Sequence, residues 1–226
     1  LIYRGDQILR GFDKEIRDHV AEEMIKSGIS ISLNADVAQI NLVAGGLELT
    51  GSNGKAENFD KILTATGRTP NSDDLGLDNS GVQIGEKGEI LVDSYSKSSR
   101  ESVYAIGDVT NRSNLTPIAI REAMSFIETV FRDTPEKLDY RFIPTAVFTT
   151  PEVGTVGLTE EEASQFAPLA IYTTKFKSMR EGFAGREDRV FMKLIVEEKN
   201  QKVLGCHFVS PFAGELVQLA AVAVTM

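Results

Sequence analysis

Asp108 is the clearest candidate for chemistry in this sequence. It follows the apolar run 103–106, which has strand character, and it stands directly after Gly107. Ligands of open α/β sheets bind at the carboxyl ends of the strands, and a carboxylate there can accept hydrogen bonds from neighbouring hydroxyls of a sugar or ribityl chain. An aspartate that only caps a turn would have the same surroundings, so both interpretations stay open at this point.

A strong helix start lies shortly after that aspartate. We predict Thr116 at the N-cap and Pro117 at the first position of a helix over residues 116–131. The free amides and positive dipole end of this helix would stabilise an electron-rich group such as a reduced flavin. An ordinary helix would begin in the same way.

Two arginines near the first residue are candidates for binding phosphate. Arg4 follows the short apolar run 1–3, which has strand character, and Arg10 lies in the loop after it. In a dinucleotide-binding fold, an arginine at the end of the second strand selects the 2′-phosphate of NADPH, whereas an acidic residue selects the free hydroxyl of NADH. Two solvated loop arginines are the alternative interpretation.

Gly67 and Arg68 follow a run that ends at Leu63 and has strand character. A glycine after a strand lets a ligand approach the backbone closely, because no Cβ is in the way. A tight turn between two domains would account for the same glycine, so a ligand contact is one of two interpretations.

The thiol and imidazole groups form no catalytic pair. Cys206 and His207 are adjacent in an apolar strand-like run, so their side chains point to opposite faces, and a buried structural cysteine is the favoured interpretation. His19 lies away from the apolar stripe of its helix, which predicts a solvated side chain. A single cysteine excludes an intrachain disulfide and a cysteine-rich metal site, and it suits a reducing compartment such as the cytoplasm.

The composition is that of a globular protein, with 42% hydrophobic and 25% charged residues among 226. Lys and Arg number 24 and Asp and Glu number 33, which gives a net charge of −9. Neither a nucleic acid nor an anionic membrane is an expected partner, because there is no basic excess and no basic run. No apolar run approaches the roughly 18 to 20 residues of a membrane-spanning helix.

The elements that must position these residues predict an α/β region followed by an α+β domain. A strand at 1–3, a helix that Asp13 can cap and Gly28 can end, and a strand at 29–33 form a piece of a parallel α/β unit. An antiparallel meander is predicted over residues 38–63. Further short strands are predicted at 90–92 and 102–106.

From Ile143 onward the pattern indicates an antiparallel sheet with helices. Thr159 and Glu162 form the sequence of a capping box, and residues 214–224 have the apolar spacing of a helix. The predicted strands cover residues 146–149, 153–158, 170–176, 191–196 and 203–209.

Taken in order, these motifs resemble those of the flavoprotein disulfide reductases, and most closely the glutathione reductases. The run ATGRTPN at 65–71 looks like the family's ATGRxPN junction, and YAIGDV at 104–109 looks like its second flavin fingerprint. Further similar runs are LTP at 115–117, IPTAVF at 143–148, PEVGTVGLT at 151–159, LGCH at 204–207 and AGE at 213–215. The resemblance covers essentially the whole chain.

The resemblance implies three segments and a homodimer. Residues 1–66 would be the C-terminal part of a Rossmann-like NADPH-binding domain, and residues 67–140 the returning segment of an FAD-binding domain. Residues 141–226 would be the N-terminal part of an α+β interface, or dimerisation, domain with an antiparallel sheet.

The resemblance also implies a role for each candidate. Asp108 would bind the ribityl chain of FAD and the backbone at Thr116 the flavin, while Arg4 and Arg10 would bind the 2′-phosphate of NADPH and Gly67 would lie against the nicotinamide nucleotide. The full set of implied cofactor-binding residues is Arg4, Arg10, Gly67, Arg68, Gly107, Asp108, Asn114, Leu115 and Thr116.

Several family features are absent from these 226 residues. They include the first FAD-binding region with its redox-active CxxxxC pair, the Gly-rich loop of the NADPH domain, and the His-Pro-Thr motif that supplies the catalytic base. Met124 stands where some members place a substrate-binding arginine. We therefore assign no catalytic residue and no metal, and we expect a fragment that is inactive by itself.

The leading functional hypothesis is FAD- and NADPH-dependent reduction of glutathione disulfide by the full-length enzyme, in redox homeostasis. A soluble pyridine nucleotide transhydrogenase or a dihydrolipoamide dehydrogenase-like flavoenzyme is the second. A non-catalytic dimerisation remnant is the third, and absorbance of bound flavin would separate it from the first two.

Overall fold

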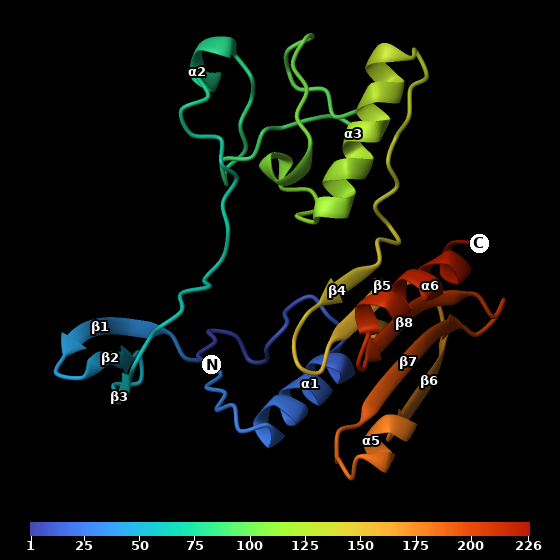
Figure 1. Ribbon diagram of the computed structural model, residues 1–226. Coiled ribbons are helices and arrows are strands. Elements are labelled where there is room, and N and C mark those ends of the chain that lie inside the picture. Colours follow the sequence, from blue (N-terminus) through green and yellow to red (C-terminus); the bar gives the residue numbers. More distant parts are fainter. The chain divides into compact units, whose positions relative to one another are not determined.

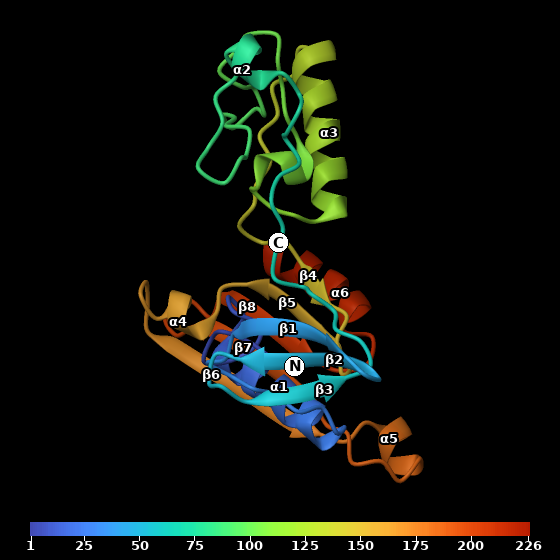
Figure 2. The same ribbon diagram turned by 90° about the vertical axis from the view of Figure 1, so that its left-hand side faces the viewer.

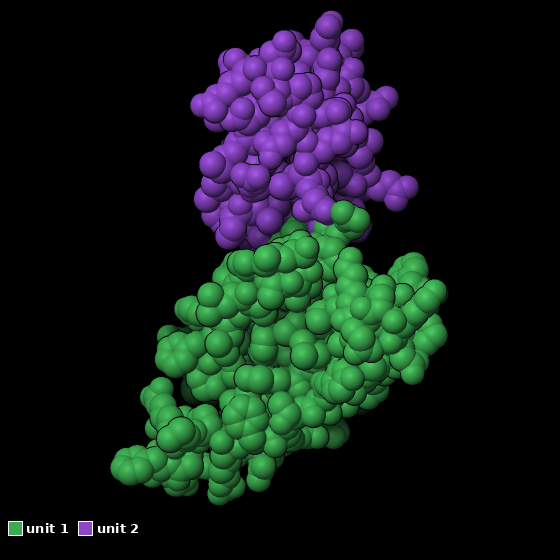
Figure 3. Space-filling view, turned by 90° about the vertical axis from the view of Figure 1, so that its right-hand side faces the viewer, with its two compact units in different colours: residues 1–62, 141–226 green, residues 63–140 purple.

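The computed structural model describes residues 1–226. The chain folds into two compact units. The first unit joins Leu1–Ile62 to Arg141–Met226, and the second is Leu63–Tyr140 (Figure 3). Two segments far apart in the sequence thus share one packed body. The assignment of 1–66, 67–140 and 141–226 to three family domains stays a prediction.

The first segment forms the predicted piece of a parallel α/β unit, with shorter strands than expected. Asp13 is the N-cap of α1 (Lys14–Lys26), and its carboxylate accepts a hydrogen bond from the Glu15 amide. Gly28 has a φ of +89° just beyond the helix, as the C-terminal signal predicts. Ile2 and Ser32 form a single parallel bridge across the helix.

The antiparallel meander after it is confirmed (Figure 2). It contains β1 (Val37–Val43), β2 (Gly46–Gly51) and β3 (Ala56–Phe59), paired in that order. Gly46 has a φ of +157°, and a Cβ on it would lie 2.5 Å from the Phe59 carbonyl oxygen. Glycine is required there because the turn brings two backbones into contact.

The last segment forms a five-stranded antiparallel sheet of order β4-β5-β8-β7-β6 (Figure 1). Its strands are β4 (Thr145–Val147), β5 (Val153–Gly157), β6 (Leu169–Phe176), β7 (Val190–Glu197) and β8 (Val203–Val209). Its helices are α4 (Glu160–Ala163), α5 (Met179–Phe183) and α6 (Ala213–Thr225). The predicted capping box at Thr159 and Glu162 is present at the start of α4.

Helices cover both faces of the sheet at β5 and β8, whereas most of edge strand β6 is exposed. Ile16 and Val20 of α1 pack with Val153 and Val209 on one face, and Val217 of α6 packs on the opposite face. The strand period of two sends neighbouring residues to opposite faces. The continuous apolar strands of this domain follow from that two-sided burial.

Cys206 and His207 confirm this alternation. The thiol lies in the core under α6, and burial raises its pKa to about 11, as expected of an inert structural cysteine. The imidazole on the other face is fully buried, with hydrogen bonds to the Thr155 hydroxyl and, at 3.1 Å, the Leu158 carbonyl oxygen. Burial lowers the His207 pKa.

The prediction of a solvated His19 was wrong. The side chain is only 4% exposed, because α1 presses a wider face against the sheet than its apolar stripe indicates. The ring centroids of His19 and Phe191 lie 5.4 Å apart, and Nε2 lies 3.1 Å from the Arg189 carbonyl oxygen. Burial lowers the pKa of this imidazole.

The second unit contains α2 (Leu77–Ser80), a 3₁₀ turn η1 (Gly107–Thr110) and α3 (Thr116–Phe131), which has the bounds predicted for it. The strands predicted at 90–92 and 102–106 were wrong, since this unit has only isolated bridges such as Ile84–Ile90 and Lys97–Tyr104. The strand predicted to end at Leu63 is β3 of the first unit, which ends earlier, at Phe59. Apolar runs become strands only beside a partner strand, and residues 63–140 contain no sheet.

We expect Gly154→Ala to destabilise the first unit by separating α6 from β5. A Cβ at Gly154 would lie 2.4 Å from the Ala213 carbonyl oxygen, and overpacking of this kind costs about 1 to 3 kcal/mol. Thermal unfolding should show a midpoint lower by roughly 2 to 4 °C for each kcal/mol lost. Gly182→Ala is the matched control, because nothing lies within 4 Å of a Cβ there; equal midpoints for both variants would contradict the packing described.

Candidate functional site

The turn that carries Asp108 is fixed against α3. Gly107 has a φ of +70°, and a Cβ on it would lie 3.1 Å from the Ala119 Cβ. The Thr110 hydroxyl donates to the Gly107 carbonyl at 2.8 Å and closes the turn. Only glycine combines this backbone conformation with this closeness to the helix, so the turn presents Asp108 next to the start of α3.

Asp108 forms an ion pair with Arg68, another predicted site residue. Its Oδ2 lies 2.9 Å from the Arg68 Nη2, and the two side chains are 43% and 76% exposed. An exposed pair contributes about 0 to 1 kcal/mol. The carboxylate can therefore exchange Arg68 for the hydroxyl groups of a ligand at little cost.

The N-cap of α3 differs by one residue from the prediction. Leu115, not Thr116, is the N-cap, because its carbonyl accepts the amides of Ile118 and Ala119, both at 3.0 Å. Leu115 has no side-chain oxygen, and no side chain caps this end of the helix. Because Pro117 has no N–H and the next two amides donate to Leu115, the Thr116 amide is the donor left at this end of the helix for an electron-rich group. Nearby, the side-chain Nδ2 of Asn114 donates to the side-chain Oδ1 of Asn111 at 3.3 Å.

A buried carboxylate, which the sequence analysis missed, organises this turn. Glu122 of α3 is 2% exposed; its Oε2 accepts the Gly107 amide and its Oε1 the Tyr140 hydroxyl, both at 2.5 Å. The Arg112 Nη2 lies 3.0 Å from the same Oε1. Burial is the largest cause and the hydrogen bond to Glu122 the next largest, and they raise the pKa of Tyr140 to about 12. The phenol is thus a neutral donor.

The pattern of α3 held a signal for Glu122. This helix buries Glu122 and Ser125, whereas Ile120, Met124 and Phe131 are 58%, 53% and 73% exposed. Polar residues at helical spacing within an apolar helix indicate a face turned to a polar network. The opposite face of the helix is apolar and exposed.

The two arginines near the first residue lie in the first unit, on either side of a folded loop. Arg4 and Arg10 are exposed, and neither guanidinium makes a hydrogen bond or ion pair. The loop between them is held to α1 by Arg17, whose Nε donates to the Ile8 carbonyl and whose Nη2 donates to the Gln7 carbonyl, both at 2.8 Å. Two unpaired cations therefore stand on one ordered segment.

The remaining candidate, Gly67, has a φ of +132°, and no atom lies within 4 Å of where a Cβ would be. The backbone there is accessible from outside. The structure thus brings Arg68, Gly107 and Asp108 together beside the start of α3 in one unit, and it places Arg4 and Arg10 in the other.

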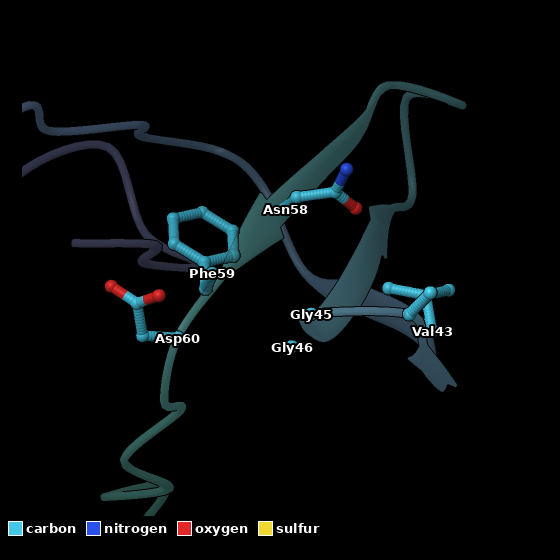
Figure 4. Close-up of a pocket in the computed structure, with 7 residues that line it drawn as sticks. Val43, Gly45, Gly46, Asn58, Phe59 and Asp60 are labelled. Atoms are coloured by element: carbon cyan, nitrogen blue, oxygen red, sulfur yellow. The ribbon is translucent and has the colours of Figure 1, made fainter.

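A hollow of about 310 Å³ lies at the tip of the meander and holds none of these residues (Figure 4). Its walls are the glycine turn and the end of β3, and they are formed by Val43, Ala44, Gly45, Gly46, Asn58, Phe59 and Asp60. With no predicted site residue in it, we assign it no role in the chemistry. None of the helices combines the length and the apolar composition that a membrane span requires.

Comparison with known proteins places this geometry in a family. Residues 1–123 match the model of the pyridine nucleotide-disulphide oxidoreductases, and residues 143–226 match the model of their dimerisation domain. The chain belongs to the pyridine nucleotide-disulphide oxidoreductases. Enzymes of the glutathione reductase branch of this family use FAD and NADPH.

Curated relatives include two glutathione reductases and a trypanothione reductase. The chain is 41% identical over 224 residues to glutathione reductase from Burkholderia cepacia, covering 99% of this chain and 50% of the relative. It is 46% identical to the chloroplastic/mitochondrial glutathione reductase of Pisum sativum, covering 98% and 40%. It is 39% identical to trypanothione reductase of Leishmania donovani, covering 100% and 47%. The chain thus spans about half the length of these relatives.

A solved structure agrees with this fold. The HOCl-induced flavoprotein disulfide reductase RclA from Escherichia coli superposes with a TM-score of 0.90 at 24% sequence identity, covering 99% of this chain and 52% of that one. At this identity the likeness supports the architecture, which is the mixed α/β and antiparallel fold that the sequence predicted.

We expect Tyr140→Phe to destabilise the second unit in a pH-dependent way. The variant removes a hydrogen bond to a buried carboxylate, worth roughly 1.5 to 3 kcal/mol. Because the folded-state pKa of Tyr140 is raised from 10.0 to about 12, the contribution is complete below pH 10 and is lost as the pH rises toward 12.

Urea unfolding of wild type and variant at pH 8 and pH 11 measures this. The free-energy difference between the two proteins should be smaller at the higher pH. Tyr172→Phe, at a 56% exposed tyrosine, is the control and should change neither value. A Tyr140→Phe effect that is equal at both pH values would rule out the bond to Glu122 as its source.

Proposed function

We propose that the complete protein is an FAD- and NADPH-dependent reductase of glutathione disulfide, to which this chain contributes parts of both cofactor sites. The observation that carries the proposal is the Asp108 turn beside the uncapped start of α3, held in place by buried Glu122. Membership of the oxidoreductase family and the glutathione reductases among the relatives support the choice of reaction.

The residues around Asp108 fit a flavin. The half-exposed carboxylate offers acceptors for ribityl hydroxyls, and the free Thr116 amide offers a donor for the electron-rich edge of the ring. The amide of Leu115, the other residue proposed here, donates to the Ser113 carbonyl at 2.9 Å in this structure. Bound FAD would supply the two-electron chemistry between nicotinamide and disulfide. The role of this chain is to hold that group and to place the positive end of α3 beside it.

The residues at the start of the chain fit NADPH. Arg4 and Arg10 carry unpaired guanidinium groups on one ordered segment, and guanidinium is the side chain best matched to a phosphate dianion. The accessible backbone at Gly67 suits the nicotinamide nucleotide, and Asn114 is proposed to contact the same nucleotide through its backbone.

Glutathione disulfide is the proposed substrate, and trypanothione disulfide is the alternative that the Leishmania relative suggests. We place the protein in a reducing compartment such as the cytoplasm, because the chain's one thiol is buried and unpaired. A homodimer is proposed because residues 143–226 match a dimerisation domain. The apolar residues Leu219 and Val222 of α6, which are 73% and 62% exposed, would meet the second copy.

A graft tests the proposal. The chain replaces the matched segment of the Burkholderia cepacia relative, and kcat/KM is measured with NADPH and each disulfide. Turnover of glutathione disulfide well above that of trypanothione disulfide supports the proposal, and the opposite order would reverse the substrate. A grafted enzyme that carries flavin but reduces neither disulfide would point to a transhydrogenase, and a colourless one to a dimerisation remnant.

In the grafted enzyme, Asp108→Ala should weaken flavin retention. Each hydrogen bond between the carboxylate and a ribityl hydroxyl contributes roughly 1.5 to 3 kcal/mol, so affinity should fall about tenfold or more. Flavin absorbance per protein after dialysis measures the effect. Asp73→Ala, at an exposed aspartate of the same unit, is the control. Equal flavin content in both variants would leave Asp108 with only a turn-capping role.

Replacing Arg4 and Arg10 together by glutamine should raise the KM for NADPH about tenfold or more, with little change for NADH, which lacks the 2′-phosphate. The effect belongs in KM, because this phosphate is remote from the hydride and is held equally in ground and transition states. Steady-state kinetics with both cofactors measures it. Arg180→Gln, on exposed α5, is the control, and equal KM changes for the two cofactors would refute the assignment.

A further inference from the structure

The most completely buried cation of the chain lies outside the sites described above. Lys193 of β7 is 2% exposed, and its Nζ contacts three carboxylates. The distances are 3.0 Å to Asp13, 2.7 Å to Glu15 and 2.6 Å to Glu160. A lysine of the dimerisation domain thus holds two acidic residues at the start of α1 and one at the start of α4.

Asp13 joins the same two helices from the other side. Its Oδ1 accepts the Glu15 amide of α1 at 3.1 Å and the Lys193 ammonium, while its Oδ2 accepts the Glu160 amide of α4 at 3.0 Å. One carboxylate therefore binds the first turns of two helices, although Asp13 and Glu160 are 147 residues apart in the sequence. Such a cap holds only while the two segments stay together.

Lys193 and Asp13 depend on each other electrostatically. Burial acts to lower the pKa of Lys193, but hydrogen bonds to Glu15, Glu160 and Asp13 outweigh it and raise that pKa. Burial acts to raise the pKa of Asp13, but bonds from the Glu160 amide and Lys193 outweigh it and lower that pKa. Both groups stay ionised at neutral pH, and removing either leaves a buried charge without its partner.

The pair stands at one end of the loop that carries Arg10. Leu9 has a φ of +55°, and the Phe12 amide donates to its carbonyl at 3.1 Å, so the chain turns tightly just before Asp13. Ile8 is buried in the core with α1. Arg17 fixes the beginning of this loop, and the contact between Asp13 and Lys193 fixes its end.

We propose that Lys193 is a positioning residue for nucleotide binding: by holding Asp13, it keeps residues 9–13 in the conformation that presents Arg10, with Arg4, to the 2′-phosphate. The inference rests on the proposed function for the identity of the ligand. It adds that a residue of the dimerisation domain, which touches no nucleotide, sets the preference for a 2′-phosphorylated one.

The test uses the 226-residue chain and three variants. Lys193→Met removes the ammonium and keeps a long side chain. Asp13→Asn removes the charge but keeps an N-cap acceptor, so it tests the ion pair even if Lys193→Met does not fold. Lys175→Met is the matched control, since Lys175 pairs with Glu22 at the other end of α1 at 3.3 Å, where both side chains are well exposed.

Amide hydrogen exchange reports the position of the loop without any ligand. We expect residues 9–16 to exchange about tenfold faster or more in Lys193→Met and Asp13→Asn, with β7 and β8 still protected, and no change in Lys175→Met. Unchanged exchange of residues 9–16 in both test variants would overturn the positioning role.

Titration with 2′,5′-ADP, with ADP as the probe that lacks a 2′-phosphate, reports the consequence. We expect the Kd for 2′,5′-ADP to rise about fivefold or more in both test variants, a loss of roughly 1 kcal/mol, and the Kd for ADP to stay the same. If the Arg4 and Arg10 double variant loses 2′,5′-ADP while the Lys193 variant retains it, the inference fails and the proposed function stands. If wild type binds both probes equally, the proposed NADPH site fails, and the exchange experiment still decides whether Lys193 holds the loop.

Discussion

Two-sided burial of the five-stranded sheet is the constraint on which the first unit depends. The sheet receives α6 from its own segment on one face and α1 from the start of the chain on the other. A sheet with one bare apolar face would expose Val153, Phe191 and Val209, so the core of residues 143–226 is completed by residues of the first segment, Leu1–Ile62. Lys193 stands on that shared face and is neutralised only by acidic groups from both segments.

A buried charged side chain with several partners also orders the second unit. Glu122 is buried with Arg112 and Tyr140, and through the Gly107 amide it determines where Asp108 stands. In both units, a charged side chain that touches no proposed ligand fixes the backbone beside a residue that does. Buried groups with several partners fix the backbone. The side chains of Arg4, Arg10 and Asp108 are exposed or half-exposed, so they can exchange contacts with water for contacts with a ligand.

The features that the sequence predicted correctly are those that depend on residues close together in the chain. Asp13 as a cap, Gly28 beyond α1, the box of Thr159 and Glu162, and the alternation of Cys206 and His207 all depend on residues a few positions apart, and each is confirmed. Strands at 90–92 and 102–106 failed because a strand requires a neighbour that this unit does not contain. The buried environments of His19 and Lys193 could not be predicted, because their partners Arg189 and Asp13 lie 170 and 180 positions away in the sequence. The cofactor roles rest on the family pattern.

The contact between Asp13 and Lys193 also determines when this protein can fold. The two residues are 180 positions apart, and at a synthesis rate of roughly 5 to 20 residues per second the helix waits about 10 to 40 s for its partner sheet. During that interval the second unit, residues 63–140, emerges and can form first. The apolar face of α1 stays uncovered meanwhile, and long-range closure of this kind is slow. The apolar face of α1 is therefore covered only after β7 and β8 have been synthesised.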